Sequence, residues 1–178
     1  WSAERPTAPR PLASPVALPI SGACGGAACA GFSFHDDSGI ETVADKVVSH
    51  AGGASMRVEA SATNEHGHGR VMQVVDVTPH RCYRVRMWVK TEDFGPDGAL
   101  RMMVLADGRN LAPRDFRVPA TADWQELTML FNSRTATSVR VYAGLWNGSR
   151  GQLWLDDWSI EEVGLLNVLR RDGTPVRV

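Results

Sequence analysis

The feature that most constrains the fold is an alternation of apolar and polar residues with period two, which recurs in short segments over most of the chain. Such alternation places successive side chains on opposite faces of a β-strand. Glycine, proline, aspartate and asparagine bound these segments, and none of them has the 3.6-residue apolar spacing of an amphipathic helix. The predicted strands are 55–60, 70–77, 82–90, 100–106, 124–132, 138–146 and 153–162, with weaker candidates at 31–35 and 45–50.

About nine short strands with turn-rich connections predict an all-β fold, a two-sheet antiparallel β-sandwich of the jelly-roll type. The 178 residues suffice for one good-sized domain. Residues 1–20 hold five of the ten prolines and show almost no periodicity, which is typical of an extended arm. We therefore predict a Pro/Ala/Gly-rich arm at 1–30, a β-sandwich at 31–163 and a connector toward a further domain at 164–178.

Composition excludes some partners and indicates a compartment. The formal net charge is −1, and no apolar run approaches the roughly 18 residues that span a bilayer, so we expect neither a nucleic-acid nor a membrane partner. Cys24 and Cys29 are close in sequence and form either a small disulfide or two unpaired thiols. A disulfide suits a secreted or periplasmic protein. Cys82 is expected to be a free thiol.

Two strands carry arginine and aromatic residues on the face opposite their apolar side. In 82–90, Arg86 and Trp88 oppose the apolar set that includes Val85, and in 138–146, Arg140 shares a face with Tyr142. Arginine and aromatic side chains together suit a surface that meets a planar polar ligand.

An adjacent pair of carboxylates, Asp156 and Asp157, lies inside the apolar run LWLDDWSI. Strict alternation places Asp156 on one face with Trp154 and Trp158, which we expect to be the core face. A lone buried carboxylate costs several kcal/mol, and a calcium ion, which binds six to eight oxygens, would satisfy it. Asp36 and Asp37 form a second acidic cluster near the start of the folded part. Alternatively, backbone amides or an arginine satisfy Asp156, and the Asp36–Asp37 pair makes a turn.

Five pieces in order resemble the xylanase-associated carbohydrate-binding modules of families four, nine and twenty-two, which are galactose-binding-like jelly rolls. The pieces span residues 31–163 and are F-x-F, G-x-S-M-R-V, RVMQVVDVTPHRCYRVRMWVKT, ADWQELTMLFN and TSVRVYAGLW followed by GQLWLDDWSIEEV. The resemblance implies a two-sheet jelly roll, a structural calcium between the first and last strands, and a glycan groove on the concave sheet.

The resemblance also implies site residues. Asp156 matches the calcium ligand of the last strand, with Asp157 in reserve. Where the family has Phe-Glu in its first strand, this chain has Phe34–His35, so that Asp36 or Asp37 would replace the glutamate ligand. Trp124 matches a structural position and is expected in the core.

Sugar sites combine an aromatic platform with directional polar groups. Trp146 ends a predicted strand beside an Asn/Gly/Ser turn and is the first platform candidate, followed by Tyr142 and Trp88. The polar candidates are Arg86, Arg140, Gln73 and Asn147.

Three functions from different classes follow. The first is a non-catalytic module that holds a plant or microbial polysaccharide for an attached or associated bacterial glycoside hydrolase, in which case the chain is one piece of a larger secreted enzyme. The second is a structural sandwich that packs on a catalytic domain without binding glycan. The third is a jelly-roll polysaccharide lyase, with Tyr142 or His66 as the base and Arg140 or Arg86 neutralising a uronate.

Overall fold

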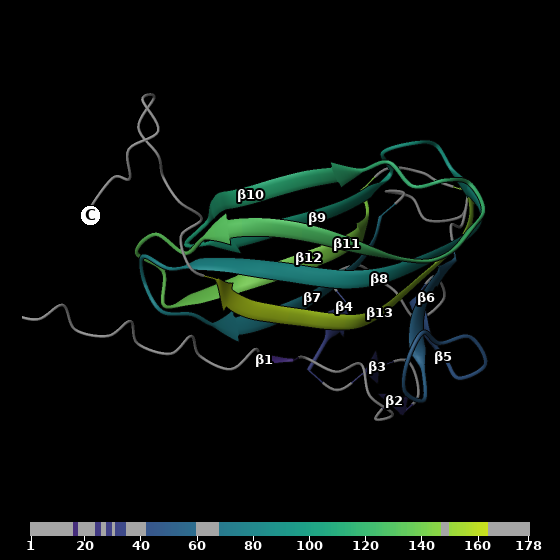
Figure 1. Cartoon of the computed structure of the whole chain (residues 1–178), viewed down its shortest axis with the longest axis horizontal. Helices are drawn as coiled ribbons and strands as arrows, with labels where there is room; N and C mark the ends of the chain where they lie inside the picture. The colour runs from purple at the N-terminus through teal and green to yellow at the C-terminus, as the bar shows by residue number, and fades with distance from the viewer. Residues whose placement is uncertain are drawn as a thin grey trace, which may run out of the picture.

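The computed structural model describes residues 16–17, 24–25, 28–29, 31–34, 42–59, 68–146 and 150–163. These residues form two antiparallel sheets and no helix, which confirms the predicted β-sandwich (Figure 1). Sheet 1 has the order β11 (Ala122–Asn132), β8 (Cys82–Gly95), β13 (Arg150–Val163), β6 (Ser55–Glu59) and β5 (Thr42–Asp45), and β1 (Val16–Ala17) also pairs with β13. Sheet 2 has the order β10 (Arg109–Phe116), β9 (Leu100–Ala106), β12 (Ser138–Leu145), β7 (Gly69–Asp76) and β4 (Ser33–Phe34).

The core lies between the inner faces of the two sheets. Alternate residues of β8 are buried, and so are alternate residues of β9, as the period-two pattern requires. Val85 and Met87 from sheet 1 join Met102 and Val104 from sheet 2 in one apolar cluster. Full burial of each such side chain stabilises the fold by about 1.5–3 kcal/mol.

The structure differs from the predicted strands in two places, at β10 and after β5. β10 was not predicted, because RNLAPRDF lacks alternation and contains Pro113; as the edge strand of sheet 2 it tolerates a proline. The weak candidate at 45–50 is wrong, since β5 ends at Asp45 and a turn follows. The Asp45 Oδ1 atom accepts the amide N–H groups of Val47 and Val48, at 2.8 and 3.1 Å, which stops the strand there.

A β-bulge in β13 breaks the predicted alternation of LWLDDWSI. The Cα partners in β8 run from Asp156↔Trp88 to Ser159↔Arg86, so β13 carries one extra residue, and Asp157 has a φ of 45°. Trp154 pairs with Lys90 and therefore lies on the outer face of sheet 1. The prediction that Trp158 faces the core is confirmed, whereas the same prediction for Trp154 and its neighbour Asp156 is wrong.

A small ribbon of β2 (Cys24–Gly25) and β3 (Ala28–Cys29) places Cys24 opposite Cys29 as Cα partners. Directly opposed residues of antiparallel strands lie at a Cα separation that suits a disulfide, and the Cys24–Cys29 bond stays a prediction. Cys82 is a half-buried free thiol. Within the described residues there is no helix of the length and apolarity that crossing a membrane requires. The predicted boundaries of the arm and connector also stay predictions.

Candidate functional site: two aromatic faces

The predicted binding residues divide between the two outer faces of the sandwich. Antiparallel Cα partners share a face, so the register of sheet 2 collects one set around Tyr142. We call the outer face of sheet 2 the β12 face; it includes Arg70, Met72, Val74, Asp76, Arg101, Met103, Leu105, Asp115, Arg140 and Tyr142, with Trp146 at its end. Trp88 and Arg86 lie on the outer face of sheet 1, on the opposite side of the molecule.

Trp146 follows the last residue of β12 and is half-buried. The guanidinium carbons of Arg70 and Arg101 lie 5.3 and 5.8 Å from its ring centroid, within range of a cation–π interaction. Both nitrogens of the Arg101 fork bond Asp115, Nε to Oδ1 and a terminal NH₂ to Oδ2 at 3.1 Å. This pair raises the pKa of Arg101 and lowers that of Asp115. The Trp146 ring, the first predicted sugar platform, therefore lies beside two arginines.

Apart from Arg140, the side chains on the middle part of the β12 face are mostly apolar. Tyr142 is 3% exposed and pairs with Met72 and Met103, so it supports the surface rather than offering a free ring. Arg140 is exposed between Leu105 and Val74, and Val74 is 59% exposed. The structure thus brings Trp146, Tyr142 and Arg140 together on one face, as predicted.

The structure places Gln73 on the inner side of sheet 2 and not on the β12 face. Gln73 pairs with the core residue Val141, and its Nε2 atom lies next to Gly31. The Gln73 side chain therefore points to the inner side of sheet 2, where Oε1 is buried without a hydrogen-bond partner in the described part of the chain. Asn147 lies outside the described residues, as do Asp36, Asp37 and His66.

The outer face of sheet 1 carries a second aromatic cluster, which we call the His50 cluster: His50, Trp88, Trp124, Asp156 and Asp157. The His50 imidazole stacks on Trp88 with 3.9 Å between ring centroids and 14° between planes. Trp124 meets His50 edge-on at 5.6 Å, so its predicted place in the core is wrong. The imidazole covers one face of Trp88, the other aromatic platform that the sequence suggests.

His50 comes from the β5–β6 loop and ties that loop to β13. Its Nδ1 atom lies 2.6 Å from Asp157 Oδ2, and its backbone N–H donates to Asp156 Oδ2 at 2.8 Å. No signal in the sequence marks His50, because a single histidine before a Gly-Gly turn is a common surface residue. Sequence reasoning missed this contact for that reason.

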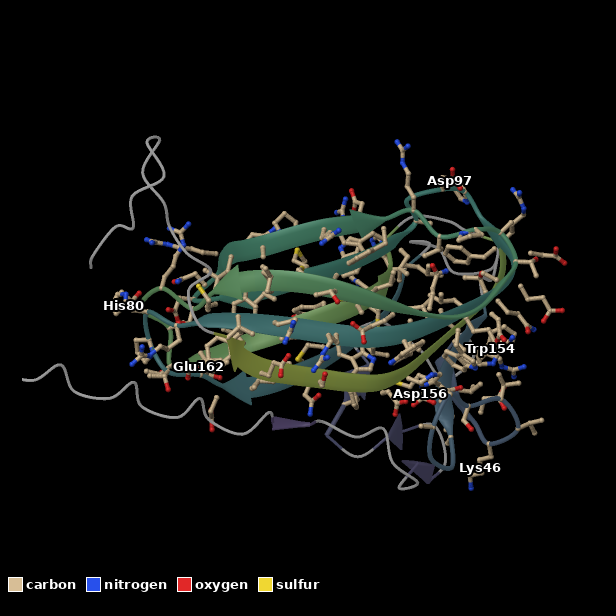
Figure 2. All side chains as sticks on the ribbon, in the orientation of Figure 1. Lys46, His80, Asp97, Trp154, Asp156 and Glu162 are labelled. Atoms are coloured by element: carbon tan, nitrogen blue, oxygen red, sulfur yellow. The ribbon has the colours of Figure 1, made fainter. Side chains whose placement is uncertain are left out.

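Asp156 is fully buried, and its carboxylate is satisfied by backbone amides. Oδ2 accepts the N–H of His50, Oδ1 accepts the N–H of Asp157 at 2.7 Å, and the amide of Ala51 also contributes. Burial raises the pKa of Asp156, and these amides offset part of that rise. Figure 2 shows Asp156 and Trp154 on β13, close to the hairpin that carries Lys46. The alternative interpretation of Asp156, satisfaction by backbone amides, is what the structure shows.

Asp45 holds the other end of the same loop. Its Oδ2 atom accepts the indole N–H of Trp154 at 3.0 Å and lies 3.7 Å from Arg57 Nε. Burial acts to raise the pKa of Asp45, but the Trp154 hydrogen bond and the amides of the following turn together hold it below the ordinary value. Trp154 thus anchors the β5–β6 hairpin rather than filling the core.

Arg86 also has a structural partner. Arg86 and Arg84 both contact the Glu161 carboxylate, Arg86 at 3.0 Å. Because this ion-pair network lies on the outer face of sheet 1, Arg86 cannot join Arg140 in one binding site.

The described residues contain no preformed set of side-chain ligands for the predicted calcium ion. No group of three His, Cys, Asp or Glu side chains there is arranged to hold a metal, and both carboxylate oxygens of Asp156 accept amide hydrogens. Asp36 and Asp37 lie outside the described residues, so the calcium site stays a prediction.

Thermal unfolding with added calcium or with a chelator tests that site. If Asp156 and the Asp36–Asp37 pair bind calcium, millimolar calcium raises Tm and EGTA lowers it, since a ligand that binds only the folded state stabilises it. Magnesium serves as the matched control ion, because its preference for six ligands in an octahedron suits such a cage poorly. Identical Tm values in calcium and EGTA contradict the calcium prediction.

Comparison with known proteins supports the fold and leaves the family open. No protein-family model matches the sequence, and no curated protein is significantly similar to it. Among solved structures, an arabinose-bound MgGH51 α-L-arabinofuranosidase matches with a TM-score of 0.64 at 14% identity, over 85% of this chain and 27% of that one. A cyclase from Fischerella sp. TAU matches with a TM-score of 0.64 at 13% identity, over 84% of this chain and 98% of that one.

Carbohydrate-binding modules also share the fold. The CBM22-1 xylan-binding domain of Paenibacillus barcinonensis Xyn10C matches with a TM-score of 0.55 at 14% identity, over 85% of this chain and 95% of that one. Modules of families 4 and 16 are among the similar structures as well. This chain spans about a quarter of the length of the arabinofuranosidase. These neighbours, which include both carbohydrate-binding modules and enzymes, establish the β-sandwich fold of this chain.

Proposed function

We propose that the protein is a non-catalytic carbohydrate-binding domain that holds a polysaccharide on the β12 face for an attached or associated glycoside hydrolase. The observation that carries this proposal is the position of Trp146, a half-buried indole at the end of the β12 face, beside two arginines. An aromatic ring that adjoins directional polar groups is what a sugar ring requires.

The fold neighbours add support. Several of them are carbohydrate-binding modules, and one is a glycosidase several times longer than this chain. A secreted or periplasmic location belongs to the same proposal, and the opposed Cys24 and Cys29 positions are consistent with it. Binding is expected to be weak, micromolar to millimolar, because immobilising a flexible glycan offsets much of the contact energy.

A structural role on a catalytic domain is the second candidate, and one observation favours it. Val74, which is 59% exposed, and the half-buried Leu105 flank Arg140 on the β12 face. Exposed apolar side chains in one place often mark a protein interface. Binding to glycans distinguishes this role from the first.

An affinity-gel panel of xylan, β-glucan, mannan, alginate and pectin tests the proposal. Retardation by at least one glycan is expected, and Trp146→Ala should weaken it about five- to thirtyfold, since a lost stacking platform removes roughly 1–2 kcal/mol. Trp124→Ala, the same change on the opposite sheet, is the matched control and should bind as the unmodified protein does. Free migration in every gel favours the scaffold role, and a loss of binding with Trp124→Ala instead contradicts the assignment to the β12 face.

A further inference from the structure

The β12 face carries an exposed arginine, Arg140, whose charge a surface for neutral sugar does not need. Three adjacent strands, β7, β9 and β12, each contribute one arginine to it: Arg70, Arg101 and Arg140. Among the residues that the structure describes, the acidic side chains on this face are Asp115, whose carboxylate is held by Arg101, and Asp76, the Cα partner of Ser138 at the far end. Arg140 is exposed and has no ion-pair partner within the described residues.

The arginines bound an apolar strip at its two ends. Arg70 and Arg101 adjoin Trp146 at one end, and Arg140 lies six residues earlier along β12, roughly 20 Å away at the usual strand rise. Between them lie the half-buried side chains of Met72 and Met103 and the Tyr142 ring, which is 3% exposed. The exposed parts of the two methionines offer an apolar contact for a sugar ring, with a guanidinium at each end.

The positive charge continues past Arg140. Its Cα partner is Leu105, and the two residues that follow Leu105 line an open cavity of about 260 Å³ at that end of the sandwich. Arg109 and Arg134 also line this cavity, and neither has an ion-pair partner among the residues that the structure describes. Asp107 is the single acidic residue of the cavity lining.

We propose that the β12 face takes an acidic polysaccharide, whose sugar residues carry carboxylates, in preference to a neutral one. This inference rests on the proposed function and specifies the class of its ligand. The planar guanidinium donates two parallel N–H bonds to a carboxylate. A neutral glycan would cover Arg140 without supplying the anion that offsets its lost hydration. Trp146 and the two methionines contact the sugar rings, and Arg140 selects those that are charged.

The test compares polymers that share a backbone and differ in charge. Polygalacturonate and its methyl-esterified form, with alginate and neutral xylan alongside, are run in affinity gels against the protein. We expect retardation by a carboxylate polymer, a much weaker effect of the methyl ester and of xylan, and weaker binding as salt rises. Sulfated dextran is included to separate carboxylate recognition from attraction to any polyanion.

Variants of Arg140 locate the selectivity. Arg140→Gln should weaken binding of the carboxylate polymer about five- to tenfold, and Arg140→Lys should restore part of the loss, because lysine keeps the charge but not the planar fork. The control, Arg81→Gln, removes one charge from an exposed arginine at the start of β8 in sheet 1, where it lies 3.6 Å from Glu162. It should bind as the unmodified protein does.

The outcomes separate the two proposals. Equal retardation by methyl-esterified and free polygalacturonate, with Arg140→Gln unchanged, overturns the acidic specificity and leaves glycan binding standing. Equal losses with Arg140→Gln and Arg81→Gln, together with equal binding of sulfated dextran, overturn it in favour of unspecific charge attraction. Free migration through all gels overturns the proposed function itself.

Discussion

Replacing Asp156 with alanine is expected to lower the free energy of unfolding by about 3–5 kcal/mol. The carboxylate is fully buried and accepts the amide N–H groups of His50 and Asp157. Each buried donor left without an acceptor costs about 1–3 kcal/mol, and the loss also releases the loop that His50 holds on sheet 1. Relief of the buried charge, whose pKa is raised by desolvation, offsets a minor part of this loss. Urea unfolding followed by tryptophan fluorescence measures the change.

The neighbouring carboxylate provides the control for that experiment. Asp157→Asn keeps a residue type that tolerates the φ of 45° and an oxygen that accepts a hydrogen bond from His50. Because the Asp157 side chain is 33% exposed, we expect a loss below about 1 kcal/mol. Equal losses for Asp156→Ala and Asp157→Asn would show that the buried carboxylate does not organise the loop.

Replacing Gly144 with alanine is the second change with a large expected effect. Gly144 has a φ of 135°. A Cβ atom there would clash with the Gly69 carbonyl oxygen and would lie 3.0 Å from Arg70 Cα. Both obstacles are backbone atoms of β7, so β7 and β12 must separate or the chain must bend to admit a methyl group. We expect a loss of about 3–5 kcal/mol, measured by urea unfolding.

Gly108→Ala separates this steric effect from the cost of the backbone conformation. Gly108 has a φ of 71°, and nothing lies within 4 Å of a Cβ placed there. Alanine at Gly108 is therefore expected to cost about 1 kcal/mol, from the left-handed conformation alone. If Gly144→Ala costs no more than Gly108→Ala, the close approach of β7 and β12 is not what the protein requires.

The strands that could be predicted from the sequence are those with one face in the core. β7, β8, β9 and β12 were predicted because most of their inward-facing residues are apolar and recur at every second position in the core. β10 has no such pattern: it lies at an edge, and much of its surface is exposed. Hydrophobic alternation therefore cannot detect it.

β13 shows how one extra residue misleads a period-two argument. Leu153 and Leu155 face the core before the bulge, and Trp158 and Ile160 face it afterwards. A strict alternation through LWLDDWSI must be wrong on one side of Asp157, and it was wrong for Trp154 and Asp156. The signal that could have revealed this is the aspartate pair itself, since aspartate tolerates the left-handed conformation that the bulge uses.

The candidate sites were predictable to different degrees. Trp146 and Arg140 were placed on one face because strand register is a local property that alternation records. Trp88 and Arg86 were grouped with them wrongly, because sequence does not say which sheet a strand joins. The contacts of His50 with Trp88 and Asp156 join residues that are 38 and 106 positions apart in the sequence, and local patterns carry no information about them.

The most direct test of the central claim, glycan binding on the β12 face, is an NMR titration of the isotope-labelled protein with an oligosaccharide of whichever glycan the gels retain. The predicted result is a set of shifted amides along 70–74, 101–105 and 140–146, together with the Trp146 indole N–H. Shifts confined to His50, Trp88 and the bulge of β13, or no shifts at saturating ligand, would contradict the claim.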